Sequence, residues 1–178
     1  MTGQSVYVVL DGSQIPLAVA EIENLLRSVG IRTTRNSTLS QCFLEKMYRF
    51  TPVDSEYLPF LVTIKNLVSY STKIGVELVS CTLHKDMNSD SLAKEFLDGL
   101  TLHHFSEIID EGETFKIELL TVGKFRNHEF PTKSEFYSWI PKISMKITNL
   151  VGGVPDLFTP FHQIDFIVNG SGSILLGH

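Results

Sequence analysis

The chain has 178 residues, of which 43% are hydrophobic and 20% are charged. This length accommodates one ordinary domain or two small ones, and the composition supports a packed core and excludes wholesale disorder. The net charge of −5 argues against a protein coated in nucleic acid, so the distribution of charge along the chain matters more than its sum.

Features of targeting and redox chemistry point to the cytoplasm. No apolar run approaches the roughly 20 residues of a membrane span, and the N-terminus lacks the basic-then-apolar layout of a signal peptide. Cys42 and Cys81 are the only cysteines, too few for a zinc site or for a disulfide framework. We therefore expect a cytoplasmic protein with reduced thiols and no membrane contact.

The chain opens with a predicted strand and helix. A β-branched apolar run at 5–10 predicts a buried strand. A helix is expected to begin near Pro16, where a missing N–H costs nothing, and to stop at Gly30. Its predicted buried face consists of Ala18, Ile22, Leu25 and Val29.

The middle of the chain is harder to assign. Strands are predicted at 31–36 and 41–50, with Thr51-Pro52 ending the pattern. A helix is expected near 55–68, followed by a β-rich stretch at 74–83. The residues Ser89-Asp90-Ser91 predict the cap of a helix that runs to about Gly99.

The last third has the clearest patterns. A turn at 110–113 precedes a strand at 114–122 that alternates apolar and polar residues. Thr132 is expected to cap a helix from Lys133, which Pro141 should kink or divide and which should end at Gly152-Gly153. Two strands, 163–168 and 173–176, flank a hairpin turn. The predicted apolar seam of that helix consists of Phe136, Ile140, Ile143, Ile147 and Leu150.

Charge is unevenly distributed along the chain. Residues 86–113 hold eight acidic residues and one basic residue, whereas 116–146 hold six basic and three acidic residues. A solvated surface explains any charge run, but a basic segment beside a loop is also typical of phosphate binding.

No catalytic motif stands out. The phosphate-binding, zinc-protease and nucleophile-elbow signatures are all missing from the sequence. His103-His104 near Glu107 is better explained as a surface pair than as metal ligands. Cys81 with His84 is weak evidence for a nucleophile and base. We predict neither a catalytic residue nor a metal site.

The stretch 112–178 resembles the THUMP domain, an RNA-binding module of tRNA-modifying enzymes. The resemblance lies in 112–118 (GETFKIE), 122–126 (VGKFR), 154–160 (VPDLFTP), 163–168 (QIDFIV) and 174–177 (ILLG), in the family's order. Pro155 stands where the family usually has valine, which weakens the match at that turn.

The N-terminal residues 7–10 (YVVL) and 16–26 (PLAVAEIENLL) resemble the start of archaeal tRNA guanosine N2-methyltransferases. The resemblance implies an α+β to α/β protein with a ferredoxin-like domain at 1–75 and a THUMP domain at 76–178. In those enzymes a methyltransferase domain follows and binds S-adenosylmethionine. Its (D/N)-P-P-(Y/F) signature does not occur here, so we expect no cofactor in this chain and catalysis by a linked or separate domain.

The resemblance also implies tRNA, rather than DNA, as the partner, held by its acceptor stem and 3′ end. Lysines and an arginine would neutralise phosphates, while an aromatic ring and an imidazole on the same loop would stack on an unpaired base. Core packing is an equal alternative for Phe125. The predicted RNA-binding residues are Lys124, Arg126, Lys133, Lys142, Lys146, Phe125 and His128.

Other functions remain open at this level. A THUMP domain also serves thiouridine synthesis and acts as an adaptor for tRNA acetylation. A ferredoxin-like regulatory or protein-interaction domain, a different class of function, is consistent with the acidic balance and predicts no salt-dependent RNA binding.

Overall fold

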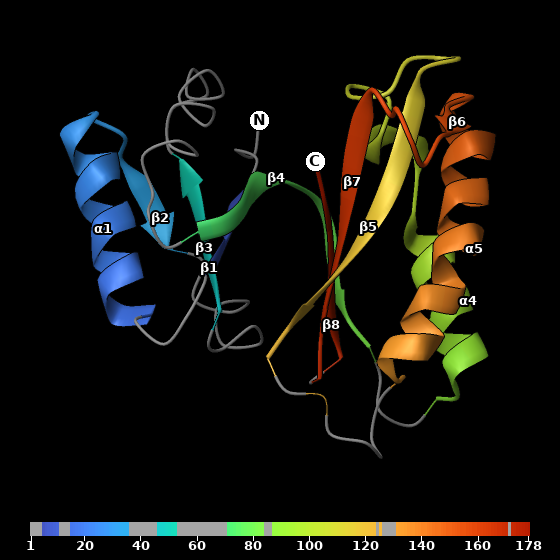
Figure 1. Ribbon diagram of the computed structural model, residues 1–178, viewed down its shortest axis with the longest axis horizontal. Helices are drawn as coiled ribbons and strands as arrows, with labels where there is room; N and C mark the ends of the chain where they lie inside the picture. The colour runs from blue at the N-terminus through green and yellow to red at the C-terminus, as the bar shows by residue number, and fades with distance from the viewer. Residues whose placement is uncertain are drawn as a thin grey trace. The chain divides into compact units, whose positions relative to one another are not determined.

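The computed structural model describes residues 5–10, 15–35, 46–52, 71–83, 87–123, 125, 131–170 and 172–178. The chain divides into two compact units, Met1–Glu77 and Leu78–His178, and the result is a mixed α/β fold (Figure 1). The division falls inside β4 (Ser71–Thr82), the strand formed by the β-rich stretch, so β4 contributes to the sheet of each unit.

The first unit is an antiparallel sheet with one helix. It contains β1 (Val6–Leu10), α1 (Ile15–Ser28), β2 (Thr33–Arg35) and β3 (Met47–Pro52). The strand order is β2-β3-β1-β4, and each described pair is antiparallel. Alternate residues of β1 face α1, because side chains of a strand point to opposite faces. The shared core consists of Val6, Val8, Leu10, Ala18, Ile22, Leu26, Tyr48 and Phe50.

Two details of the first unit differ from the prediction. Leu26 is buried in place of Val29, which is 36% exposed because the helix has already ended at Ser28. Thr51-Pro52 does not break β3 but completes it, since Pro52 lies opposite Thr33, beyond the β1–β3 pairing that ends at Phe50. A proline at a strand end removes few ladder hydrogen bonds. The helix expected near 55–68 lies outside the described residues.

The second unit contains α4 (Ser89–Gly99), the 3₁₀ turn η2 (Leu102–His104), β5 (Thr114–Val122), α5 (Lys133–Val151), β6 (Val154–Pro155), β7 (His162–Asn169) and β8 (Ser173–Gly177). The strand order is β4-β8-β7-β5-β6, with β5 parallel to β6 and β7. The hairpin of β7 and β8 confirms the predicted turn between them.

Helices α4 and α5 lie side by side along one face of this sheet (Figure 1). The alternation predicted for β5 is confirmed, since Phe115, Ile117 and Leu119 are all buried. They meet a buried face of α5 that consists of Phe136, Trp139, Ile143 and Ile147.

The boundaries of α5 follow from local chemistry. The Thr132 hydroxyl accepts a hydrogen bond from the Glu135 N–H (3.3 Å), and the Glu135 carboxylate accepts one from the Thr132 N–H (2.5 Å). This reciprocal pairing satisfies donors that a helix start leaves unpaired. Gly152 ends the helix at φ +74°, a left-handed conformation that favours glycine.

The structure narrows one prediction about the helices and corrects two others. Pro141 does not divide α5, which runs as one helix from Lys133 to Val151. Trp139 joins the fully buried face, whereas Ile140 is half-buried. The cap of α4 is Asn88, whose Oδ1 accepts a hydrogen bond from the Ser91 N–H at 2.9 Å.

Candidate nucleic-acid interface

The seven residues predicted to bind RNA divide into two groups. Lys124, Arg126 and His128 lie outside the described residues. The structure places the other four, of which three are on α5 and one lies just before it in sequence: Lys133, Lys142, Lys146 and Phe125.

Phe125 is half-buried and packs against the core of the second unit. Its ring lies edge-to-face against Phe136, with the ring centroids 6.1 Å apart. Phe136 belongs to the first turns of α5 and packs in turn on Trp139, at 5.0 Å. The residue between Lys124 and Arg126 in sequence is therefore anchored at the N-terminal end of α5, and core packing is the contact that the structure records for it.

The three lysines of α5 do not form a single surface. Successive residues of a helix point about 100° apart around its axis. Lys142, nine residues after Lys133, therefore points in a direction about 180° from that of Lys133, whereas the directions of Lys142 and Lys146 differ by only about 40°. Because the buried face lies between them, Lys133 projects from one flank of α5 and the other two lysines from the opposite flank.

The flank with Lys142 faces α4 and is partly neutralised. The Lys142 Nζ lies 3.2 Å from Asp90 Oδ1, and the two side chains are 47% and 91% exposed. An ion pair this exposed contributes little to stability, on the order of 0–1 kcal/mol. Its consequence is electrostatic, because the carboxylate offsets the positive charge that a phosphate would meet at Lys142.

The flank with Lys133 pairs a cation with an exposed aromatic ring. The Lys133 Nζ lies 5.8 Å from the centroid of the Tyr137 ring, and Tyr137 is 50% exposed. This is within the range of a cation–π contact. Tyr137 was missed by the sequence reasoning, although the spacing of four residues places it beside Lys133 on a helix. Together the two side chains suit a phosphate and an unstacked base.

Among the residues considered as metal ligands or as a nucleophile and base, the structure describes His103, His104, Glu107 and Cys81. No cluster of His, Cys, Asp and Glu in the described part of the chain is arranged to hold a metal ion. The His104 Nδ1 accepts a hydrogen bond from the Thr101 N–H at 3.1 Å, and burial together with His103 lowers the pKa of His104. Burial, aided by Glu95, raises the pKa of the Cys81 thiol to about 11, so the reactive thiolate is scarce at neutral pH. His84 lies outside the described residues.

A cluster that the sequence did not indicate lies where β7 begins and β8 ends. The His162 Nε2 is 2.8 Å from Glu113 Oε2, and its Nδ1 is 3.1 Å from His178 Nε2. The backbone N–H of Asp110 and the imidazole of His162 lower the pKa of Glu113. Burial and His162 lower the pKa of His178. These residues are far apart in sequence. The parallel pairing of β5 with β7 brings Glu113 to His162, and the antiparallel pairing of β7 with β8 brings His178 to His162.

Comparison with known proteins places the fold. No family model matches the sequence, and no curated protein is similar to it in sequence. Solved structures match nearly the whole chain at low identity. A possible methylase from Clostridium difficile 630 is 12% identical over 98% of this chain and 40% of its own, with a TM-score of 0.61.

TrmN from Thermus thermophilus is 13% identical over 98% of this chain and 44% of its own, with a TM-score of 0.56. A 4-thiouridine synthetase solved in a complex with RNA and bound ATP is 12% identical over 99% of this chain and 41% of its own, with a TM-score of 0.51. The chain spans about half or less of the length of the solved structures it matches. Among the described helices, none is long and apolar enough to cross a membrane.

Proposed function

We propose that this chain is the tRNA-binding recognition module of a tRNA-modifying enzyme and that it holds the acceptor stem and 3′ end. The observation that carries the proposal is the fold: both units together match a 4-thiouridine synthetase from an RNA complex and TrmN over 98% or more of the chain. The order of THUMP-like motifs in 112–178 supports the same function.

The geometry of α5 narrows the expected contact surface. Lys133 and Tyr137 lie on the flank of α5 that is free of the Asp90 carboxylate. Phe125, which stands between Lys124 and Arg126 in sequence, contacts Phe136 at the same end of the helix. We therefore assign the main phosphate contacts to Lys124, Arg126 and Lys133, and a stacking contact to Tyr137.

The remaining predicted residues have secondary roles in this proposal. Lys142 and Lys146, on the opposite flank, contribute to the long-range attraction of RNA more than to a specific contact. His128 is proposed to stack on a base. Confining phosphates to one end of one unit is consistent with a chain whose overall charge is negative.

The finer proposal is a tRNA (guanine-N2) methyltransferase. S-adenosylmethionine would supply the methyl group in a catalytic domain. This chain has no (D/N)-P-P-(Y/F) signature, because each of its prolines is isolated, so none of its residues is assigned to that cofactor. The contribution of this chain is positional: holding the end of the tRNA fixes which distant nucleotide reaches the catalytic domain.

A second candidate is recognition for thiouridine synthesis, favoured by the match to a 4-thiouridine synthetase. Recognition of the acceptor end would be the same, and only the chemistry would differ. Nucleoside mass spectrometry of tRNA from cells lacking the gene distinguishes the two: loss of N2-methylguanosine supports the methyltransferase, and loss of 4-thiouridine supports the synthetase.

Binding of unmodified tRNA across a salt series tests the recognition function. Each lost phosphate contact reduces the slope of log K against log salt by roughly 0.7 to 0.9. The Lys124→Ala/Arg126→Ala double variant should therefore be shallower by about one to two, and Lys133→Ala by about one. Lys94→Ala, at an exposed position of α4, is the matched control for loss of one positive charge and should leave the slope unchanged.

Two outcomes would contradict the recognition function. One is no binding of tRNA at low salt by the wild-type chain, and the other is an identical slope in the wild type and the double variant. Either result would favour the regulatory or protein-interaction class, which predicts indifference to these substitutions.

A further inference from the structure

The loop between β6 and β7 exposes three large apolar side chains. Leu157 is 73% exposed, Phe158 is 93% exposed and Phe161 is 75% exposed. Single exposed apolar residues are common on proteins, but a group of them within five positions indicates an interaction site. This is the turn of the THUMP-like motif, which the tRNA contacts proposed above do not use.

The loop is held in one shape by hydrogen bonds. The Asp156 carboxylate accepts from the Phe158 N–H (2.8 Å), the Thr159 N–H (3.2 Å) and the Thr159 hydroxyl (2.9 Å). The Phe161 N–H donates to Thr114 Oγ1 at 2.9 Å, which ties the loop to the start of β5. A preformed loop loses little conformational entropy when a partner binds, so its exposed rings are effective anchors.

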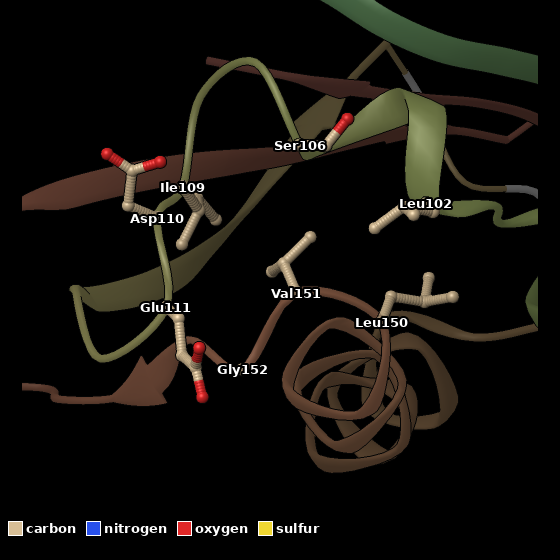
Figure 2. A pocket seen from close by; sticks show the side chains of 8 residues that line it. All are labelled: Leu102, Ser106, Ile109, Asp110, Glu111, Leu150, Val151 and Gly152. Carbon is tan, nitrogen blue, oxygen red and sulfur yellow. The ribbon is translucent and has the colours of Figure 1, made fainter.

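An open pocket of about 360 Å³ is lined in part by residues 150–152, which precede the loop in the chain (Figure 2). Its apolar lining includes Leu102, Ile109, Leu150 and Val151, and its acidic lining is Asp110 and Glu111. Figure 2 shows Leu102 and Val151 pointing toward one another, with both carboxylates on the side away from Leu102. A long side chain with an apolar stem and a positive end fits this lining.

The pocket and the loop belong to the same end of the second unit. Gly152, which lines the pocket, accepts a hydrogen bond from the Gly112 N–H at 3.0 Å. The backbone N–H of Val154, which begins the exposed segment, donates a hydrogen bond to the backbone carbonyl oxygen of Glu113 at 2.8 Å. Both bonds join the segment after α5 to the turn before β5. We call the pocket and the residues Leu157, Phe158 and Phe161 the β5-start surface.

Charge at this end disfavours a nucleic acid. The sequence has no lysine or arginine after Lys146, and Asp110, Glu111 and Glu113 immediately precede β5. Lys116, the basic residue of β5, lies opposite Gln163 in the sheet. The two ends of β5 lie about 26 Å apart, because eight steps of about 3.3 Å separate Thr114 from Val122, the residue that the basic segment follows in sequence. This separation exceeds the Debye length of about 8 Å at physiological salt.

We propose that the β5-start surface docks a protein partner that offers an apolar cleft together with a lysine or arginine. The cleft receives Phe158 and its neighbours, while the basic side chain enters the pocket and meets Asp110 and Glu111. A second copy of the chain fits poorly, because a two-fold contact through this surface sets the same carboxylates against one another. The site lies beyond the tRNA contacts, and its existence does not depend on them.

Site-specific photocrosslinking in the native cells tests the proposal. The photoreactive residue p-benzoylphenylalanine is incorporated at position 158 of the full protein, with position 137 on α5 as the matched site. Both native residues are exposed aromatic side chains, so folding should be unaffected. We expect position 158 to form a discrete adduct with another protein that resists ribonuclease, and its crosslinked peptide to contain apolar residues beside a lysine or arginine.

The purified partner then provides the quantitative test. Phe158→Ser and the charge reversal Glu111→Lys should each weaken its binding at least tenfold, with tRNA affinity within twofold of wild type. Met145→Ser, at a 66% exposed apolar position of α5, is the control and should have no effect.

Four results would overturn the proposal: an adduct at position 158 that ribonuclease removes, an adduct of two copies of this chain, no adduct above background, or partner binding that neither substitution weakens. The adduct at position 137 reports separately on the tRNA proposal. If that adduct is not RNA while position 158 still captures its protein, recognition of tRNA through this flank fails and the docking surface stands.

Discussion

Replacing Phe125 by alanine separates its two possible roles, core packing and base stacking. Burying a whole phenylalanine removes roughly 150 to 250 Å² from water, so half-burial corresponds to roughly 100 Å² and, at about 25 cal/mol per Å², to about 2.5 kcal/mol. The edge-to-face contact with Phe136 adds on the order of 1 kcal/mol. We therefore expect Phe125→Ala to destabilise the second unit by about 3 to 4 kcal/mol.

The chain contains its own reporter for this measurement. Trp139 is the single tryptophan, is 1% exposed, and packs on Phe136 with ring centroids 5.0 Å apart. Its fluorescence during denaturant unfolding reports on the second unit alone. Phe125→Leu keeps most of the apolar area without the ring and is expected to lose only about 1 kcal/mol.

Measuring tRNA affinity on the same proteins completes the test. If Phe125 acts mainly through packing, Phe125→Leu restores both stability and affinity. The reasoning is refuted if Phe125→Ala unfolds within about 0.5 kcal/mol of wild type while losing tRNA binding, because the ring would then serve the RNA and not the core.

Further substitutions test the other structural assignments. Thr132→Ala removes the side-chain acceptor at the start of α5 and should cost about 1 kcal/mol, whereas Ser134→Ala, at an exposed position of the same helix, should change the same unfolding curve little. Asp90→Ala releases Lys142 and should strengthen tRNA binding at low salt with almost no change in stability; weaker binding would show that this flank is not screened by Asp90. The lowered pKa of Glu113 means that its carboxylate stabilises the fold above the ordinary value of 4.5 and that this contribution is lost as the pH falls through the lower folded value. Glu113→Gln should therefore be less stable than wild type at pH 6 and should approach it in unfolding experiments near pH 3. Burial raises the pKa of the Cys81 thiol to about 11. In a Cys42→Ser variant, Cys81 should therefore react with iodoacetamide at pH 7.5 at least about 100-fold more slowly than free cysteine does. An equal rate would show that the Cys81 thiol is not buried.

The two proposed surfaces lie at opposite ends of β5. The basic segment and the N-terminal end of α5 follow its last residue, Val122, and the exposed apolar loop is tied to its first residue, Thr114. A rigid strand between an RNA contact and a protein contact keeps their separation constant.

The sequence by itself determined the elements whose signals are local. The capping box at Thr132, the stop at Gly152 and the alternation along β5 were predictable because each depends on residues within one turn or one strand. The hairpin between β7 and β8 was predictable for the same reason. The opposite flanks of Lys133 and Lys142 likewise follow from their spacing of nine residues on a helix.

Only the tertiary structure decided which neighbours each face meets. Periodicity placed Ile140 in the seam of α5, yet Trp139 is the buried residue, because the position of α4 beside α5 sets the centre of the buried face. The pairing of Lys142 with Asp90 joins residues 52 positions apart, and that of His162 with Glu113 joins residues 49 positions apart. No local pattern encodes such contacts, because they depend on the packing of helices and on the order of strands in a sheet. The exposure of Phe158 was also not predictable from the sequence, because whether an apolar side chain is buried depends on which elements pack around it in the folded chain.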